Sequence, residues 1–514
     1  MRESWRRLML DELLARAARQ APETIAFRCG AVARSYAAAE DRVRRLANAL
    51  HDRGVRRGDR VAVMMQNSIE TVEAYLGVVR AGAICVPVNF RFVAAEVAQL
   101  VADAEPAFVI CDEATRDMAR GGGDDRLIVA TDQVGAGVRL EDIIASAPAD
   151  PIELERDESD IAFMMYTSGT TGRPKGALLS HLNLIANTMN MFAALEIGAS
   201  DRNWLAGLPL FHIAGLSGLL PFLYVGGTST ILSSTAFDAA AVADVMERDR
   251  ITSCYFVPTQ WQMICALPGV RERSFGLERV TWGASIAPRA VLDAIAETFP
   301  GARMYNVFGQ TEMSPITCVL RADLYPDTHG SIGKAVPGVE MRLVDDGMND
   351  VAPGQVGEIV YRGPNTFAGY WKLPEATADA FAGGWFHSGD LVQADPDGFL
   401  HVVDRKKDMI ISGGENIYCP ELEATIVSHP AVQEVAVIGM PHPKWVETPW
   451  AIVVLKPGEA AEAGDIVDWC RARLASYKKP SRVVFVEKLP RNASGKIVKP
   501  EIRRRYVEDQ SPNG

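Results

Sequence analysis

Segments with the periodicity of a strand and segments with that of a helix alternate along much of the chain. Residues 37–53 place apolar side chains at helical spacing, and this pattern ends at Gly54. The next segments read as strand, helix and strand: 60–65, 68–80 and 83–87. Similar strand patterns return at 252–257, 280–283 and 303–307. This alternation predicts a layered α/β fold with largely parallel sheets.

The pattern changes after about residue 323, where glycine and proline become frequent. Short alternating runs at 340–344, 357–362 and 399–403 predict a β-rich subdomain. A charged break at 404–408 precedes two helical patterns, at 421–428 and 466–474, and three strand patterns, at 432–439, 451–455 and 482–486. We therefore expect a large N-terminal domain, residues 1–406, built of α/β subdomains plus the β-rich subdomain. We expect residues 407–514 to form a small α+β domain of about 105 residues, a usual domain size.

Composition narrows the class of protein. A chain of 514 residues exceeds one typical core, and its net charge of −12 argues against a general nucleic-acid binder. It has no apolar run of membrane-spanning length, and its first residues do not resemble a signal peptide. Eight scattered cysteines without C-x-x-C spacing predict free thiols, and the histidines show no zinc-site spacing. We expect a cytoplasmic protein, either a monomer or a homodimer.

The segment 166–176 is rich in groups that bind phosphate. It combines glycines, which let backbone N–H groups approach an anion, with hydroxyl donors and one cation. The residues concerned are Thr167, Ser168, Gly169, Thr170, Thr171 and Lys175. The order of residues does not match a Walker loop, which needs Gly-Lys-Ser/Thr at the start of a helix. An apolar strand pattern precedes the segment, so we expect a phosphate-binding loop that leaves a buried strand.

This loop resembles the signature loop of the adenylate-forming superfamily, in which it holds the β- and γ-phosphates of ATP. A second motif, at 306–312, is similar to that family's next signature and implies an ATP site with Mg²⁺ on Glu312. The resemblance assigns Phe308, Gly309 and Thr311 to nucleotide binding, with Phe308 where relatives usually have tyrosine. It also places Gly283, Ala284 and Ser285 along the adenine.

The resemblance extends into the C-terminal part of the chain. Asp390 is implied to bind the ribose, Arg405 the ribose or phosphate, and Lys496 the reacting phosphate during adenylation. Lys407 is implied to be the pivot between two domain orientations, and Gly413 and Gly414 to line the path of the CoA pantetheine. The resemblance places His212 and Ala214 at the acyl pocket; His212 could equally be a packing residue. One departure is Val446, where relatives usually have glycine.

The family resemblance implies a reaction in two halves. A carboxylic acid attacks MgATP to give an acyl-adenylate and pyrophosphate, and the small domain then rotates to bring the thiol of coenzyme A. An apolar run at 216–225 favours a hydrophobic acid, and the motifs look most like bacterial fatty-acyl-CoA ligases. The alternatives are an aryl-CoA ligase, an acyl-AMP ligase that loads a carrier protein, and a non-catalytic adenylate-binding protein.

A basic segment lies near the C-terminus. Residues 478–505 hold ten Lys/Arg and two Glu. It is either a solvated tail, an electrostatic aid to the binding of ATP or CoA phosphates, or a peripheral contact with an anionic membrane.

Overall fold

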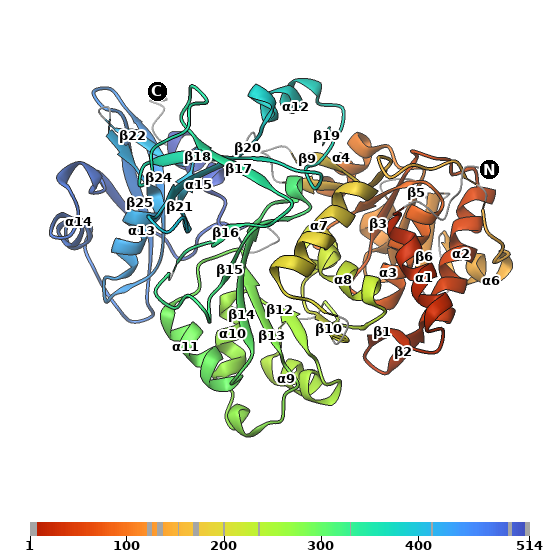
Figure 1. The fold of residues 1–514 in the computed structure, drawn as a ribbon. Helices are drawn as coiled ribbons and strands as arrows, with labels where there is room; N and C mark the ends of the chain where they lie inside the picture. Colours follow the sequence, from red (N-terminus) through yellow and green to blue (C-terminus); the bar gives the residue numbers. More distant parts are fainter. Residues whose placement is uncertain are drawn as a thin grey trace. The chain divides into compact units, whose positions relative to one another are not determined.

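The computed structural model describes residues 8–120, 126–130, 137–152, 154–167, 174–198, 201–234, 237–328, 330–412, 415–491 and 496–508. The chain divides into two compact units (Figure 1). The first holds the chain up to Met341 together with Tyr361–Phe386, and the second holds Arg342–Val360 and the chain from His387 onward. The β-rich segment is thus divided between the units. The expected domain boundary at residues 406/407 stays a prediction.

An eight-stranded sheet forms one half of the first unit. Its order is β19-β9-β8-β4-β3-β5-β6-β7, and its central strands are parallel. The strands are β3 (Arg60–Met64), β4 (Ile84–Pro87), β5 (Phe108–Asp112), β6 (Leu127–Ala130), β7 (Val138–Arg139), β8 (Ile161–Thr167), β9 (Lys175–Ser180) and β19 (Gly369–Tyr370). The central strands are apolar on both faces because helices cover both faces of the sheet.

A nine-stranded sheet forms the other half of this unit. Its order is β16-β15-β14-β13-β12-β10-β11-β1-β2, with parallel pairing from β14 to β1 and antiparallel strands at both edges. The strands are β1 (Ile25–Cys29), β2 (Val32–Ser35), β10 (Asn203–Ala206), β11 (Thr228–Ile231), β12 (Ser253–Tyr255), β13 (Arg279–Gly283), β14 (Arg303–Gly309), β15 (Ile316–Arg321) and β16 (Lys334–Ala335).

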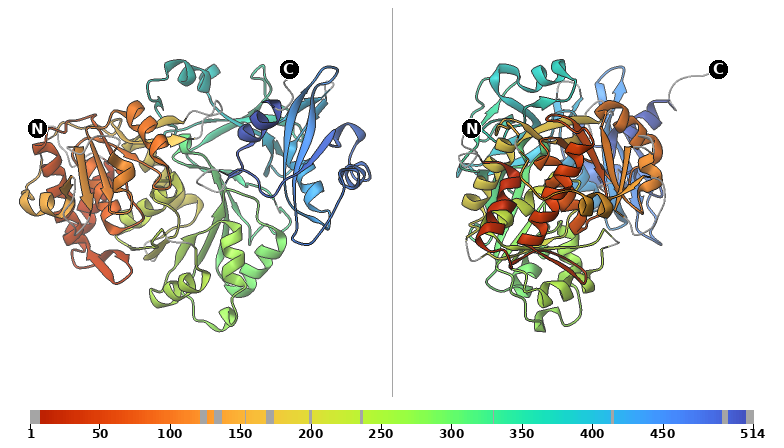
Figure 2. Two further views of the ribbon diagram at one scale, coloured as in Figure 1. Left: turned by 180° about the vertical axis from the view of Figure 1, so that it is seen from behind. Right: turned by 90° about the vertical axis from the view of Figure 1, so that its right-hand side faces the viewer.

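Helices form the layers around these two sheets. Those between them include α2 (Tyr36–Asp52), α3 (Ile69–Arg80), α7 (His181–Ala194) and α8 (Ile213–Val225), and α3 and α7 contact strands of both sheets. The helices α9 (Ala239–Arg248), α10 (Pro258–Cys265) and α11 (Arg289–Thr298) pack on the outer face of the nine-stranded sheet. The outer face of the eight-stranded sheet is covered by α4 (Ala94–Ala104) and α5 (Arg116–Ala119). The left view of Figure 2 shows the orange strands of that sheet beside the red N-terminal helices.

The second unit contains two smaller sheets. Four strands lie in the order β17-β18-β20-β21: β17 (Glu340–Val344), β18 (Val356–Arg362), β20 (Phe386–Ala394) and β21 (Leu400–Arg405). Five strands form the other sheet: β22 (Ile410–Ser412), β23 (Glu415–Ile417), β24 (Val432–His442), β25 (Val446–Leu455) and β26 (Arg482–Phe485). Helices α13 (Cys419–Val427), α14 (Ala463–Arg471) and α15 (Lys499–Glu508) accompany it. The predicted α/β class and the smaller α+β domain are confirmed.

Several helices begin where the sequence provides a side-chain cap, and α2 and α3 are two of them. Ser35 and Ser68 accept hydrogen bonds from the backbone N–H groups of Ala38 and Thr71 and so begin α2 and α3. Short elements complete the first unit: α1 (Leu10–Gln20), α6 (Leu140–Ser146), α12 (Pro374–Ala380) and single 3₁₀ turns. In the described part of the chain, no helix is long and apolar enough to cross a membrane.

A buried ionic cluster ties the N-terminal helix to the layer of helices between the sheets. The Asp11 carboxylate is fully buried and pairs with Arg80 at 2.5 Å and with Arg156 at 2.9 Å. Burial alone would raise the pKa of Asp11, but the two guanidinium groups hold it well below its usual range. His181, at the start of α7, accepts a hydrogen bond at Nδ1 from the Leu10 N–H. Burial lowers the pKa of His181 to about 4, and Asp11 opposes this shift.

This histidine makes the free energy of unfolding depend on pH. Because its pKa is lower in the folded state, its contribution is complete above about pH 6.5 and is lost as the pH falls toward 4. Between pH 7 and pH 5 the loss is about 2 kcal/mol. We predict that His181→Gln, which keeps a neutral acceptor, removes this part of the pH dependence. Urea unfolding of both proteins at the two pH values measures it, and equal losses in both would contradict the prediction.

Candidate active site

The stem of the predicted phosphate loop is an antiparallel pair of strands. Thr167, the last residue of β8, pairs with Lys175, the first residue of β9. The Tyr166 hydroxyl, just before the loop, donates to Asp103 Oδ2 at 2.5 Å, which fixes the entry to the loop. The sequence-predicted residues Ser168, Gly169, Thr170 and Thr171 lie outside the described residues. The structure thus positions both ends of the loop and, among the predicted residues, Thr167 and Lys175.

Lys175 and Glu312 converge on one tyrosine. The Lys175 ammonium lies over the ring of Tyr370, 5.0 Å from its centroid. The hydroxyl of the same tyrosine donates to Glu312 Oε1 at 2.9 Å. The cation at the loop and the carboxylate of the second motif, which are far apart in the sequence, are therefore joined through a single side chain. Sequence reasoning missed Tyr370; its signal is the Gly-Tyr-Trp run that forms a short strand beside β9.

The turn that carries Glu312 is held from several directions. Thr311 to Met313 form a single 3₁₀ turn, in which Glu312 is 8% exposed and Thr311 is half-buried. The buried amides of Asn187 and Asn365 both donate to the Met313 carbonyl, at 3.3 and 2.8 Å. The Phe367 N–H donates to the Glu312 carbonyl at 2.8 Å. The carboxylate consequently stands on a fixed backbone.

The predicted adenine-lining residues lie at the carboxyl ends of two adjacent parallel strands. Gly283 ends β13 and pairs with Val307 of β14, so Ala284 and Ser285 follow beside Phe308. A Cβ at Gly283 would lie 2.3 Å from the Val307 carbonyl oxygen, and only glycine permits this approach. Ligands of α/β sheets bind outside the carboxyl ends of strands. These residues therefore lie where a nucleotide is expected to bind.

Phe308 and Gly309 form the end of β14. Phe308 is partly exposed and its carbonyl accepts a hydrogen bond from Thr317 Oγ1 at 3.3 Å. A Cβ at Gly309 would lie 1.9 Å from the Pro315 carbonyl oxygen, so this position also requires glycine. In the second motif, the Phe308 side chain is therefore partly exposed, and the backbone at Gly309 lies close to the backbone at Pro315.

His212 and Ala214 lie at the beginning of α8, a helix that is buried along most of its length. His212 is the residue before the first helical turn, and its ring is 4.5 Å from that of Phe211. Phe211 in turn makes an edge-to-face contact with Phe90, at 5.2 Å between ring centroids. Both predicted residues are partly exposed. The aromatic cluster of Phe90, Phe211 and His212 was not foreseen from the sequence.

In the second unit, three predicted residues form an electrostatic group. Arg405 Nη1 donates to Asp390 Oδ1 at 2.7 Å across the β20–β21 pair. Burial raises the pKa of Asp390 to about 6, against the opposing effects of Arg405 and Lys496. Burial and Arg405 lower the pKa of Lys496, and Asp390 opposes this. The structure therefore brings Asp390, Arg405 and Lys496 into one site.

A hydrogen bond spans the charged segment that contains the predicted pivot. Asp404 accepts hydrogen bonds from the N–H groups of Arg405 and Cys419, each at 2.7 Å, and so connects β21 to the first turn of α13. Lys407 is exposed in the intervening turn. Its role as the pivot stays a prediction. Gly413 and Gly414 lie outside the described residues.

At least four of the ten Lys/Arg side chains in the basic segment near the C-terminus, all four of them described residues, form ion pairs within the second unit. These ion pairs are Lys478–Glu421, Lys499–Glu423, Arg491–Glu434 and Arg503–Asp408. Pairing reduces the positive field that this segment presents to a membrane or a polyphosphate.

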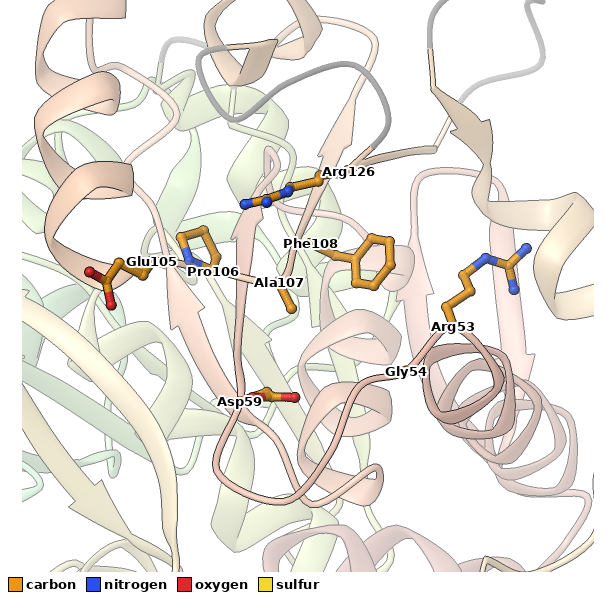
Figure 3. Close-up of a pocket in the computed structure, with 8 residues that line it drawn as sticks. All are labelled: Arg53, Gly54, Asp59, Glu105, Pro106, Ala107, Phe108 and Arg126. Carbon is orange, nitrogen blue, oxygen red and sulfur yellow. The ribbon is translucent and has the colours of Figure 1, made fainter.

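A cavity of about 400 Å³ in the first unit is separate from all of the predicted residues (Figure 3). Its lining comprises Arg53, Gly54, Asp59, Glu105, Pro106, Ala107, Phe108 and Arg126. These residues lie before β3 and at the start of β5, the amino ends of parallel strands. The phosphate loop follows the carboxyl end of β8, which runs parallel to β4. The cavity therefore lies at the amino ends of the parallel strands, whereas the phosphate loop follows the carboxyl end of its strand.

Comparison with known proteins identifies the family. The family model described as AMP-binding enzyme matches residues 14–371, and the model of its C-terminal domain matches residues 421–496. A feruloyl-CoA synthase of Amycolatopsis sp. is 40% identical over 493 residues, which cover 96% of this chain and 98% of that protein. A long-chain-fatty-acid–CoA ligase of Mycobacterium tuberculosis is 36% identical over 478 residues, covering 92% and 93%.

A solved structure is similar over almost the whole chain. The ATP-bound crystal structure of MatB from Rhodopseudomonas palustris has a TM-score of 0.86 and 32% sequence identity, covering 98% of this chain and 100% of that one. The chain belongs to the AMP-binding enzyme family, the adenylate-forming superfamily that its motifs resemble. It is an AMP-forming acid–thiol ligase, an acyl-CoA synthetase that uses ATP.

Val446 departs from the family pattern and has an unfavourable backbone conformation. Its φ angle is 71°, in the left-handed region that a β-branched residue rarely adopts. Its side chain is 70% exposed, so packing does not compensate for the strain.

We predict that Val446→Gly stabilises the second unit by about 1 kcal/mol, because relief of the left-handed strain exceeds the extra chain entropy of glycine. Thermal unfolding of the variant measures this gain. Val446→Ala is the control: it keeps a Cβ in the same conformation and should gain less. A Val446→Gly variant that is less stable than the wild type would contradict the prediction.

Proposed function

We propose that this acyl-CoA synthetase activates a hydrophobic carboxylic acid that carries an aromatic ring, and joins it to CoA through an acyl-adenylate. The cluster of Phe90, Phe211 and His212 at the start of α8 carries this proposal. Aromatic side chains favour edge-to-face or offset contacts with another ring, so such a wall suits an aromatic acid. The 40% identity to a feruloyl-CoA synthase supports the same substrate class.

In the first half-reaction, a carboxylate oxygen of the acid attacks the α-phosphorus of ATP, and the bond to pyrophosphate breaks. The carboxylate is already ionised, so the protein has no proton to remove. Catalysis then rests on positioning and on stabilisation of charge. Lys496 is assigned to the reacting phosphate, Lys175 and Thr167 to the departing pyrophosphate, and Asp390 to the ribose hydroxyls.

Glu312 fits the requirement of a magnesium ion. Mg²⁺ in nucleotide sites is held by one or two carboxylates together with the phosphates. Glu312 offers one carboxylate, oriented by Tyr370, and no group of three metal-binding side chains exists among the described residues. When bound, the ion would neutralise charge on the phosphate oxygens. Its other ligands would then come from ATP and water.

In the second half-reaction, the CoA sulfur attacks the carbonyl carbon of the adenylate and AMP leaves with the electron pair of the broken C–O bond. We assign Lys407 as the pivot about which the small domain rotates. In this proposal the rotation removes Lys496 from the site and brings in the face that bears Gly413 and Gly414. The hydrogen bond from the Cys419 N–H to Asp404 spans the turn of Lys407, so this rotation would have to break it. One site then serves both steps in turn.

The adenylation role of Lys496 can be tested separately from thioester formation. We predict that Lys496→Ala lowers acid-dependent exchange of pyrophosphate into ATP by about two to three orders of magnitude, because a charge that stabilises the transition state is lost. The variant should still convert supplied acyl-adenylate to acyl-CoA. Lys488→Ala, an exposed lysine of the same basic segment, is the control and should retain exchange. Full exchange in Lys496→Ala would contradict the assignment.

The substrate class can be tested with acids of matched hydrophobicity. We predict that phenylpropenoic acids exceed straight-chain acids in kcat/KM by about tenfold, measured by pyrophosphate release with CoA. Faster turnover of straight-chain acids would instead favour a fatty-acid substrate, which the apolar α8 and the mycobacterial relative also support. Release of pyrophosphate without acyl-CoA product would favour a carrier-protein acceptor.

A further inference from the structure

Tyr370 contacts both charged groups of the proposed pyrophosphate site. Its hydroxyl donates to Glu312 Oε1 at 2.9 Å, and its ring lies 5.0 Å from the Lys175 ammonium. A hydrogen bond to an ionised carboxylate is stronger than one between neutral groups and restricts the rotation of that carboxylate. The negative face of an aromatic ring attracts an ammonium group and limits where it lies. One side chain therefore restrains a cation and an anion at the same time.

The backbone of Tyr370 is fixed to the strand that carries Lys175. In the β19–β9 pair, Gly369 lies opposite Leu178 and Tyr370 opposite Ala177. The next residue, Trp371, donates from its backbone N–H to the Gly176 carbonyl at 2.8 Å and from its indole N–H to the Asp103 carbonyl at 3.0 Å. The tyrosine consequently keeps a constant place relative to the loop's exit strand.

The same segment is also bonded to the turn of Glu312. Phe367 donates its N–H to the Glu312 carbonyl, and the Asn365 amide donates to the Met313 carbonyl, both at 2.8 Å. The rings of Phe367 and Tyr370 pack edge to face, with centroids 4.8 Å apart. Residues 365–371 therefore link the exit strand of the loop, in the eight-stranded sheet, to the end of β14, in the nine-stranded sheet.

From this arrangement we propose that Tyr370 is a positioning residue for the reaction. Its hydroxyl orients the Glu312 carboxylate toward the nucleotide-bound Mg²⁺, and its ring sets the distance between that carboxylate and the Lys175 ammonium. The inference rests on the proposed function, in which Glu312 and Lys175 act on the phosphates of ATP. It adds a residue that acts through those two groups rather than on the substrate.

The test measures ATP binding to the full-length protein without the acid, so that no turnover occurs. Calorimetric titrations of ATP are made in EDTA and at rising Mg²⁺ concentrations. Tyr370→Phe keeps the ring and loses the hydroxyl. Mg²⁺ increases the affinity for ATP, and we expect this variant to need about tenfold more Mg²⁺ to reach half of that increase. This is the effect expected from the loss of one hydrogen bond to a charged group. Its ATP affinity in EDTA should equal that of the wild type, which also verifies its fold.

Three further variants separate the parts of the proposal. Tyr370→Leu also removes the ring and should weaken ATP binding in EDTA by about fivefold. The double variant of Glu312→Gln and Tyr370→Phe should need no more Mg²⁺ than Glu312→Gln alone, because the hydroxyl acts through the carboxylate. Tyr36→Phe is the matched control. Tyr36 is a fully buried tyrosine whose hydroxyl donates to the Gly227 carbonyl at 2.6 Å, and its loss should leave the Mg²⁺ dependence unchanged.

Two results would overturn the inference, and they differ in what else fails. If Glu312→Gln shifts the Mg²⁺ dependence and Tyr370→Phe does not, the positioning role alone is wrong. If neither variant shifts it, the role of Glu312 in the proposed function fails and the role of Tyr370 fails with it.

Discussion

The proposed nucleotide site depends on a turn whose backbone is bonded to separate parts of the chain. Residues 311–313 are fixed through carbonyl groups that accept from Asn187 on α7, from Asn365 and from the Phe367 N–H. A buried carboxylate on a mobile turn would rotate toward whatever donor lay nearest. Here the backbone leaves Glu312 little freedom, and the hydroxyl of Tyr370 restricts the side chain as well. The chemistry of this family needs such rigidity, because its rate enhancement comes from placement of charge.

Hydrogen bonds in the second unit fix the groups on either side of the charged segment 404–408. The Asp390–Arg405 pair lies on two hydrogen-bonded strands, and the ribose contact assigned to it therefore has a defined geometry. Asp404 is 4% exposed and joins the end of β21 to α13, and burial raises its pKa to about 6. The exposed Lys407 follows directly. Because Asp404 and Cys419 lie on opposite sides of this turn, a rotation about Lys407 would have to break the hydrogen bond between them.

The fold could largely be read from the sequence because its strands are buried on both faces. Such strands are short apolar runs, and β13, predicted at 280–283, is found at Arg279–Gly283. The prediction was less accurate where pairing rather than local pattern makes the strand. β25 begins at Val446 rather than at residue 451, because its first residues, which lack an apolar strand pattern, are paired with the long β24. Local pattern contains no information about that partner.

For the candidate site too, the sequence predicted the residues in local motifs and missed those whose contacts join distant segments. Glu312, Asp390 and Arg405 stand in recognisable motifs, and the structure brings Asp390, Arg405 and Lys496 together. Tyr370 and the aromatic cluster at Phe211 were missed because their contacts come from strand pairing and helix packing between distant segments. The Gly-Tyr-Trp run alone does not predict a contact with Lys175 or Glu312, because that contact depends on the pairing of β19 with β9.

The β19–β9 pairing also defines what could be moved to another protein. A graft of the phosphate loop with its two strands would carry Lys175 but neither the ring beneath its ammonium nor the carboxylate that accepts a hydrogen bond from the hydroxyl of that ring. The smallest portable unit consists of three discontinuous segments: the loop with its strands, the turn at the end of β14, and residues 365–371. Recombination between relatives should preserve function when its crossover points keep all three from one parent.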